Sequence, residues 1–264
     1  MKKVASLRYG VVFKKAFCDP EIFKGFIRDA LGIQLEIDYV ETEKTFDPPI
    51  GKVRPRFDLF AEDVKNRVIV DIQHARFGDH YDRFLHYHCV ALLEQIANSK
   101  DYRPRLKVFT IVILTSGDHY QKDISVIDFD PKDLSGKPLG EIPHKVMYIC
   151  PKYVNDKTPE PIRQWLLAID DSLDDEVEES NYQISEIQKA FMYIEKDKIS
   201  PDELARMKDE YSEEELIRKN FKEGLTEGIH QQSVETAKKM LLEGLEISLI
   251  SKCTGLTYEE ILKL

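Results

Sequence analysis

RFDLFAEDVKNRVIVDIQ, residues 56–73, contains two runs of strand-forming residues separated by a polar tetrapeptide. Residues 56–61 and 67–73 are rich in β-branched and aromatic side chains, which are enriched in strands. The segment 63–66 between them has the composition of a hairpin turn. We therefore expect two adjacent antiparallel strands.

Two aspartates of this hairpin stand among apolar residues. Side chains two apart on a strand share a face, so Asp71 and Gln73 are expected to project together. Val70 and Ile72 then project to the opposite, apolar face. An ionised carboxylate in such surroundings is costly unless something pairs with it. Asp58 has a similar setting on the neighbouring strand, and the turn can bring the two carboxylates level.

A divalent metal would relieve the repulsion between Asp58 and Asp71 and would activate a water molecule. Hard oxygen ligands of this kind suit Mg²⁺ or Mn²⁺. Two structural alternatives remain open. Asp71 pairs with an arginine such as Arg56 or Arg67, or Asp58 faces solvent on an edge strand.

The segments around the hairpin predict an α/β core. Apolar residues at helical spacings predict two short helices over residues 11–31, the second opened by Asp19-Pro20. A strand over 37–41 and a loop with Pro48-Pro49 and Gly51 precede the hairpin. A helix over 79–97 and a buried strand over 107–114 follow it.

Beyond residue 150 the pattern predicts helices, over 162–167, near 184–194 and again over 213–264. The stretch 170–179 holds seven carboxylates in ten residues and is interpreted as a solvated linker. Gly224, Gly228, Gly244 and Gly255 are expected to punctuate the last helical segment.

The C-terminal residues have the outline of a helix-turn-helix-like unit. A helix ends at Gly244, a short helix is closed by Gly255, and the capping box of Thr257 and Glu260 opens a third. Two glutamates at the start of that last helix make it a poor DNA reader, because phosphate attraction needs cations. Packing or self-association through the helix that contains Gly224 and Gly228 is favoured, so a homo-oligomer is a candidate assembly.

The formal net charge of -10 is unevenly distributed along the chain. Residues 1–150 carry 23 Lys and Arg against 22 Asp and Glu, whereas residues 151–264 carry 15 against 26. Binding to nucleic acid draws on clustered cations, so we expect it in the first part of the chain.

Several protein classes are disfavoured. No run approaches the roughly 18 apolar residues of a membrane span, and no apolar signal core follows Met1, so we expect a cytoplasmic protein without a membrane partner. The four cysteines form no CxxC pair, and we expect reduced, buried thiols. The spacing of the histidines between His74 and His88 does not suit zinc. Neither a Gly-rich phosphate loop nor GxSxG is present.

Four motifs, in order and spacing, resemble the recombination-promoting nucleases (Rpn) of the PD-(D/E)XK superfamily, a group also labelled transposases. These are FKKAF at 13–17 for the family's FKxxF, RFDLFAED at 56–63 for DVxAxD, VDIQ at 70–73 for IExQ, and RFLHY at 83–87 for RxxxY. The resemblance runs nearly end to end. It implies a restriction-endonuclease-like core, with a mixed sheet flanked by helices, and an all-helical C-terminal extension.

The resemblance implies that Asp58 and Asp71 bind a catalytic Mg²⁺ or Mn²⁺ in a DNA endonuclease. Gln73 stands where the wider superfamily has Lys. A lysine would supply positive charge near the attacking water, whereas Gln can only orient that water by hydrogen bonding.

By the same resemblance Lys14, Arg83 and Tyr87 contact the DNA substrate. For Arg83 and Tyr87, support of the metal ligands and an ordinary packing pair are the alternatives. Residues 1–150 correspond to the nuclease-like domain, 151–212 to a helical extension with the acidic linker, and 213–264 to the C-terminal helical segment.

Two departures from the family's motifs define a rival hypothesis. Asp71 replaces the more usual Glu, a shortening that metal coordination can tolerate. Gly10 stands where the family usually has an Asp, three residues before the helix Phe, and Glu21 is a candidate replacement. The rival is a catalytically inactive, DNA-binding or scaffolding descendant of a transposase-associated nuclease, and metal affinity separates the two hypotheses.

Overall fold

The computed structural model describes residues 1–47, 54–74, 80–95 and 104–264. The chain forms two compact units, Met1–Glu210 and Tyr211–Leu264. The loop predicted around Pro48-Pro49 and Gly51 lies outside the described residues, as do both ends of the helix predicted over 79–97.

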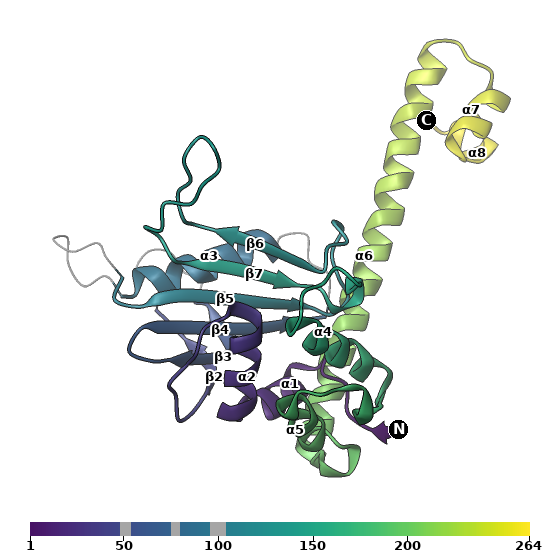
Figure 1. Ribbon diagram of the computed structural model, residues 1–264. Coiled ribbons are helices and arrows are strands. Elements are labelled where there is room, and N and C mark those ends of the chain that lie inside the picture. Colours follow the sequence, from purple (N-terminus) through teal and green to yellow (C-terminus); the bar gives the residue numbers. More distant parts are fainter. Residues whose placement is uncertain (48–53, 75–79, 96–103) are drawn as a thin grey trace. The chain divides into compact units, whose positions relative to one another are not determined.

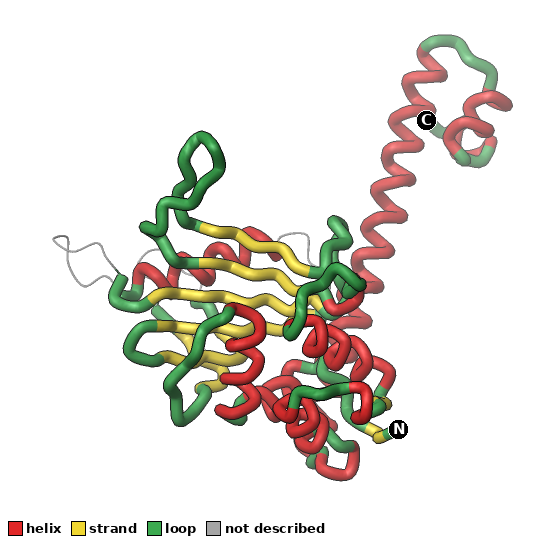
Figure 2. The backbone as a smooth tube through the Cα atoms, in the orientation of Figure 1, coloured by secondary structure: helices red, strands yellow, loops and turns green. Residues whose placement is uncertain are grey.

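The larger unit is built on a mixed sheet (Figure 1, Figure 2). Over the described ranges its six strands follow the order β2-β3-β4-β5-β7-β6. They are β2 (Glu41–Thr45), β3 (Arg56–Glu62), β4 (Asn66–Gln73), β5 (Lys107–Leu114), β6 (Ile124–Asp128) and β7 (Lys145–Ile149). The β4–β5 and β5–β7 pairs are parallel and the other pairs are antiparallel. The predicted mixed sheet of an α/β protein is confirmed.

Helices cover both faces of this sheet (Figure 1). They are α1 (Gly10–Phe17), α2 (Pro20–Leu31), α4 (Ile162–Asp171) and α5 (Ser185–Tyr193) on one face, and α3 (His80–Leu93) on the other. The first group shares one hydrophobic core with Val70 and Ile111 of the sheet. Helix α3 packs through Phe84 and Tyr87 on Ile69 in a second core. The hairpin strands are therefore enclosed between two helical layers.

The hairpin and its neighbours form as the pattern predicted. Asp63 ends β3, and its carboxylate accepts hydrogen bonds from the backbone N–H groups of Lys65 (2.7 Å) and Asn66 (2.7 Å) in the turn. Asp19 caps α2 by accepting from Glu21 and Ile22, and Pro20 follows it at the first helical position.

The strand predicted over residues 37–41 is wrong, because β2 begins only at Glu41. Ile37 and Val40 are both buried and stand three positions apart, a spacing that strand alternation cannot bury on one face. The backbone here is held by side chains instead: Lys24 donates to the carbonyl of Ile37 (3.4 Å).

The acidic stretch 170–179, expected as a linker, lies inside the larger unit. It contains β8 (Glu176–Val177), which pairs with the N-terminal β1 (Lys2–Lys3). Val177 and Ser172 are buried, and the Ser172 hydroxyl donates to the carbonyl of Ile169 (2.7 Å). The same part of the chain contains short 3-10 helices: η1 (Pro151–Tyr153), η2 (Ser172–Asp174), η3 (Glu179–Asn181) and η4 (Lys196–Lys198).

The C-terminal residues form α6 (Pro201–Leu242), α7 (Ile247–Thr254) and α8 (Tyr258–Ile261). The predicted ends at Gly244 and Gly255 and the capping box of Thr257 and Glu260 are all confirmed. Gly224 and Gly228 do not interrupt α6, because ten or more helix-forming residues flank them on each side. A small core joins the three helices, made of Ala237, Ile250, Leu256 and Ile261.

The four cysteines are free, as expected, but only Cys150 is buried and Cys253 is exposed. None of the helices in the described part of the chain has the length and apolar character needed to cross a membrane.

The central strand predicts where the larger unit is most sensitive to mutation. Ile111 of β5 is fully buried between β4 and β7, so Ile111→Ala should cost about 2–5 kcal/mol of unfolding free energy. Val126→Ala on the edge strand β6, where the side chain is 48% exposed, should change it by only about 0.5 kcal/mol. Urea unfolding followed by the fluorescence of Trp165, the single tryptophan and part of the same core, measures both. Equal losses in the two variants would contradict this view of the core.

Candidate active site

Where the backbone pairing of β3 and β4 ends, the carboxylates of the two hairpin aspartates act as the hydrogen-bond acceptors between the strands. The paired positions run from Glu62–Arg67 to Leu59–Val70. Beyond them the backbone N–H of Asp58 donates to Asp71 Oδ1 (3.0 Å), and the N–H of Ile72 donates to Asp58 Oδ2 (3.1 Å). Each carboxylate therefore binds the backbone of the opposite strand, which brings Asp58 and Asp71 together.

Strand alternation is interrupted at Asp58. Phe57 packs in the core under α3, whereas Leu59, two residues further on, packs in the core under α1. On the neighbouring strand Thr42 pairs with Leu59, and Glu43, the next residue, has a left-handed φ of 58°. Such a conformation is uncommon for a residue other than glycine. The irregular point of both strands thus coincides with the Asp58 carboxylate.

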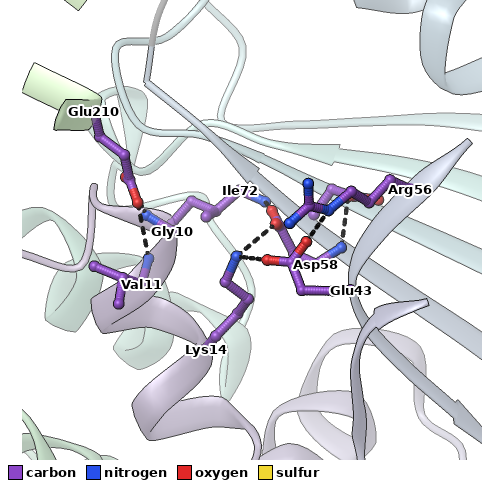
Figure 3. Close-up of polar contacts among 9 residues, drawn as sticks. Gly10, Val11, Lys14, Glu43, Arg56, Asp58, Ile72 and Glu210 are labelled. Carbon is purple, nitrogen blue, oxygen red and sulfur yellow. Dashed lines mark hydrogen bonds and ion pairs between the residues drawn. The ribbon is translucent and has the colours of Figure 1, made fainter. Parts of the chain in front are cut away.

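Lys14 of α1 brings a positive charge to this point (Figure 3). Its ammonium lies 3.4 Å from Asp58 Oδ1 and also forms an ion pair with Glu43. The other carboxylate oxygen of Glu43 pairs with Arg56. Arg56 is therefore engaged away from Asp71.

Of the structural alternatives for the aspartates, a pairing of Asp71 with Arg56 or Arg67 and an edge position of Asp58 are not found in the described hairpin. Arg67, the other proposed partner of Asp71, pairs with Glu62 and Glu94 at 2.8 and 2.7 Å. Asp58 lies on β3, which is paired on both sides by β2 and β4 and is not an edge strand.

Asp71 is the most strongly perturbed acid of the site. Its side chain is 5% exposed, and Oδ2 has no hydrogen-bond partner among the described residues. Burial and then the negative charge of Asp58 hold the pKa of Asp71 well above its ordinary value. Burial also raises the pKa of Asp58, against the attraction of Lys14. The positive charge near Asp58 and Asp71 therefore does not balance the negative charge that the two carboxylates would carry when ionised.

Gln73 and α3 complete the face on which Asp71 lies. Val70 packs in the core under α1 and Ile69 in the core under α3, so Asp71 and Gln73 project together toward α3, as predicted. Gln73 is buried, and neither atom of its amide finds a partner within the described ranges. Against the larger effect of burial, the positive charge of Arg83 acts to lower the pKa of Asp71.

Arg83 and Tyr87 share a face of α3, as their spacing predicted. Arg83 Nε donates to the Tyr87 hydroxyl (3.3 Å), and the Tyr87 ring meets Phe57 edge-on. The ring of Tyr87 is thus packed against the start of β3, which fixes the position of Arg83 beside the sheet.

The residues fit a magnesium-type ion held by two carboxylates. Mg²⁺ commonly takes one or two protein carboxylates and completes its shell with waters and substrate phosphate. Asp58 and Asp71 supply hard oxygens, including the buried Asp71 Oδ2, which has no partner within the described ranges. No group of three His, Cys, Asp or Glu side chains suited to a metal occurs in the parts of the chain that are described. A closed, all-protein cage is therefore not the type of site formed here.

Glu210 is a site neighbour that the sequence pattern did not reveal. Its carboxylate accepts hydrogen bonds from the N–H groups of Gly10 (2.7 Å) and Val11 (3.2 Å) at the start of α1. A Cβ at Gly10 would lie 3.7 and 3.8 Å from its two oxygens and 3.8 Å from the Lys14 ammonium. Glu21, the candidate replacement for an acid at position 10, instead pairs with Lys189 of α5 (2.5 Å).

Glu43 was missed as well. It stands among alternating charged and Thr residues of 41–45, which are typical of any exposed strand. Glu210 is 200 residues away from Gly10, and nothing in the pattern of α6 distinguishes it.

No family model, curated protein or solved structure matches this chain. The geometry of the site is therefore the main support for a function.

The raised pKa of Asp71 predicts that this residue destabilises the protein without a cation. Because the folded pKa lies above the unfolded one, stability falls as pH rises from the unfolded pKa through the folded pKa. Asp71→Asn keeps an acceptor for the Asp58 N–H and removes the charge, so it should raise the melting temperature near neutral pH in a chelator. The gain should shrink below about pH 4, where both states are protonated.

Asp63 in the same hairpin provides the control of opposite sign. Although burial opposes the shift, the N–H groups of Lys65 and Asn66 lower the pKa of Asp63. Its ionised form therefore stabilises the fold above the unfolded pKa, and Asp63→Asn should lower the melting temperature at neutral pH. An Asp71→Asn variant that melts below wild type at neutral pH would contradict the electrostatic account.

The contact between Glu210 and Gly10 predicts a double-mutant coupling. Glu210→Ala leaves two N–H groups of α1 without their acceptor and should cost about 1 kcal/mol, as for other lost helix caps. Gly10→Asp should destabilise wild type, because it places a second carboxylate beside Glu210. In the Glu210→Ala background the same change should stabilise, since the negative charge then faces the helix N-terminus alone. Additive effects in melting experiments would rule out this coupling.

Proposed function

We propose that this chain is a metal-dependent DNA endonuclease with a PD-(D/E)XK-type core, linked to recombination or to a mobile element. The observation that carries the proposal is that Asp58 and Asp71 each bind the opposite strand, while the buried Asp71 Oδ2 finds no partner among the described residues. Buried polar atoms without partners are uncommon and call for an explanation such as an absent ion. The mixed sheet and the motif resemblance agree with this core.

The residues take distinct roles in the proposal. Asp58 and Asp71 hold Mg²⁺ or Mn²⁺, which supplies Lewis-acid stabilisation and an activated water. In hydrolysis the water oxygen bonds to phosphorus and the bond to the leaving sugar oxygen breaks. One proton of the water passes to that oxygen and the other to solvent. Gln73, whose amide on the Asp71 face has no partner in the described part of the chain, orients the water.

A polyanionic substrate is supported by cations on both sides of the carboxylates. Lys14 comes from α1 and Arg83 from α3, and the charge of each reaches Asp71. Together with Tyr87, Arg83 is assigned to the DNA backbone, where arginine binds phosphate well.

Residues 151–212 carry 8 Lys and Arg against 16 Asp and Glu, and 213–264 carry 7 against 10. Most of the acidity thus lies outside the C-terminal segment.

Self-association through the C-terminal helices is supported by α6. Phe221, Leu225 and Ile229 are exposed and recur at every fourth residue, which places them on one helix face. An apolar stripe of this kind on a long helix is a suitable surface for a second copy of the chain.

The rival function also has a specific observation in its favour. The Lys14 ammonium already balances part of the Asp58 charge without a metal, which a non-catalytic descendant would need for stability. Metal affinity separates the two functions, because such a descendant needs no divalent ion at Asp71.

Metal binding and plasmid nicking together test the proposal. Mg²⁺ or Mn²⁺ should raise the melting temperature by mass action, and Asp71→Ala should abolish the rise. Supercoiled plasmid should be nicked by wild type with either ion, and Asp58→Ala should be inactive. The absence of any divalent binding to wild type in calorimetric titration at millimolar metal would exclude the nuclease and favour the rival.

The buried amide of Gln73 predicts a change in rate without a change in metal binding. Gln73→Ala should slow nicking by on the order of 10²-fold, as for loss of one preorganised hydrogen-bond donor, while the metal affinity stays close to that of wild type. Gln73→Lys adds a positive charge beside the phosphate and should retain or raise the activity. If Gln73→Ala nicked at the wild-type rate while Asp58→Ala was inactive, Gln73 would be a structural strand residue.

A further inference from the structure

We propose that Lys14 is the catalytic cation of this site and that Glu43 is its positioning residue. The inference rests on the proposed nuclease function and goes beyond the binding of DNA that the motif resemblance implies for Lys14. Three observations carry it: the charge balance of the hairpin, the contacts of the Lys14 ammonium, and the conformation of Glu43.

The proposed functional side chains of the hairpin carry no positive charge, and its Arg56 is paired with Glu43. Its functional side chains are the two acids Asp58 and Asp71 and the neutral amide of Gln73. Negative charge builds on the phosphate oxygens during hydrolysis, and fixed positive groups aimed at them lower the barrier. An amide donates hydrogen bonds but carries no charge. A cation from another element is therefore needed beside the metal.

Lys14 is a cation in direct contact with the Asp58 carboxylate. Its ammonium lies 3.4 Å from Asp58 Oδ1, and its charge also reaches Asp71. The side chain is only 19% exposed. Helix α1 is anchored on both sides of it, because Phe13 and Phe17 are buried and their rings stack at 4.4 Å. The ammonium is thus held in place by a rigid element, as a preorganised electrostatic group requires.

Glu43 gives the ammonium a second anchor that survives metal binding. Lys14 lies between the carboxylates of Glu43 and Asp58, and Arg56 holds the other oxygen of Glu43 (Figure 3). When a metal takes Asp58, Glu43 still orients Lys14. The left-handed backbone of Glu43, an uncommon conformation for a residue other than glycine, aims its side chain at this point (Figure 3).

Lys15 is a matched control on the same helix. It also carries a partly buried ion pair, with Glu203 at 2.8 Å, and its side chain is 21% exposed. Its ammonium donates to the carbonyl of Lys198 (2.6 Å), so its contacts are with the start of α6 and not with the carboxylate pair. Removing either lysine therefore deletes an ion pair of similar burial, but only Lys14 contacts the site.

The experiment compares Lys14→Met with Lys15→Met in the full chain. Lys14→Met should slow plasmid nicking by on the order of 10²-fold, the lower range for one preorganised electrostatic group. Its Mn²⁺ affinity in calorimetric titration should equal or exceed that of wild type, because a competing cation beside Asp58 is gone. Lys15→Met should match wild type in both measurements. Loss of a ligand, as in Asp58→Ala, would instead lower nicking and affinity together.

Each outcome of this experiment supports or overturns the role of Lys14 or the proposed nuclease function. Nicking by Lys14→Met at the wild-type rate overturns the inference and leaves the proposed function intact, as does a joint loss of nicking and Mn²⁺ binding in a variant that melts normally. A wild-type protein that binds no Mn²⁺ fails the proposed function itself. If Lys14→Met does not fold, Glu43→Gln provides the test, since it keeps Lys14 and should slow nicking about tenfold at unchanged Mn²⁺ affinity. Wild-type nicking by Glu43→Gln would then overturn the inference.

Discussion

The exchange of hydrogen bonds between two aspartates and the opposite strands organises this protein. Asp58 and Asp71 each accept an N–H that the β3–β4 ladder leaves without a strand partner. Buried N–H groups must be satisfied, so the carboxylates have a structural use even without a metal. The same contacts hold two negative charges side by side, and the network of Lys14, Glu43 and Arg83 surrounds them. Fold and chemistry thus depend on one pair of side chains.

This arrangement costs stability in a specific place. Burial of Asp71 beside Asp58 is unfavourable for the ionised form, and only part of the charge is balanced by Lys14. The two apolar cores, one on each face of the sheet, offset that cost. Sites that bind cations commonly store such unfavourable interactions, which the ligand relieves. The strongly perturbed acid of the hairpin is therefore a candidate functional residue, whereas the ion pairs of Arg67 are structural.

Several features were accessible from local pattern. The hairpin, its turn at Asp63, the capped helix after Asp19 and the buried strand β5 follow from short-range propensity and capping, which act within a few residues. The C-terminal capping box of Thr257 and Glu260 is equally local. Strand 37–41 was misassigned because its two buried residues, Ile37 and Val40, serve a loop that packs on the core, and burial of a loop leaves no periodic signal.

Alternation along β4 was enough to place Asp71 and Gln73 on one face and to mark Asp58 as their neighbour, because strand periodicity is a property of the chain. Contacts made by distant elements lay outside that information. Glu210 meets Gly10 across 200 residues, and Lys14 reaches Asp58 from a helix 44 residues earlier. Such contacts arise from how helices pack on the sheet, which short-range propensity does not encode. Residues 56–73 by themselves therefore determine the carboxylate pair. Lys14 and Glu210 come close to the pair only when the helices pack on the sheet.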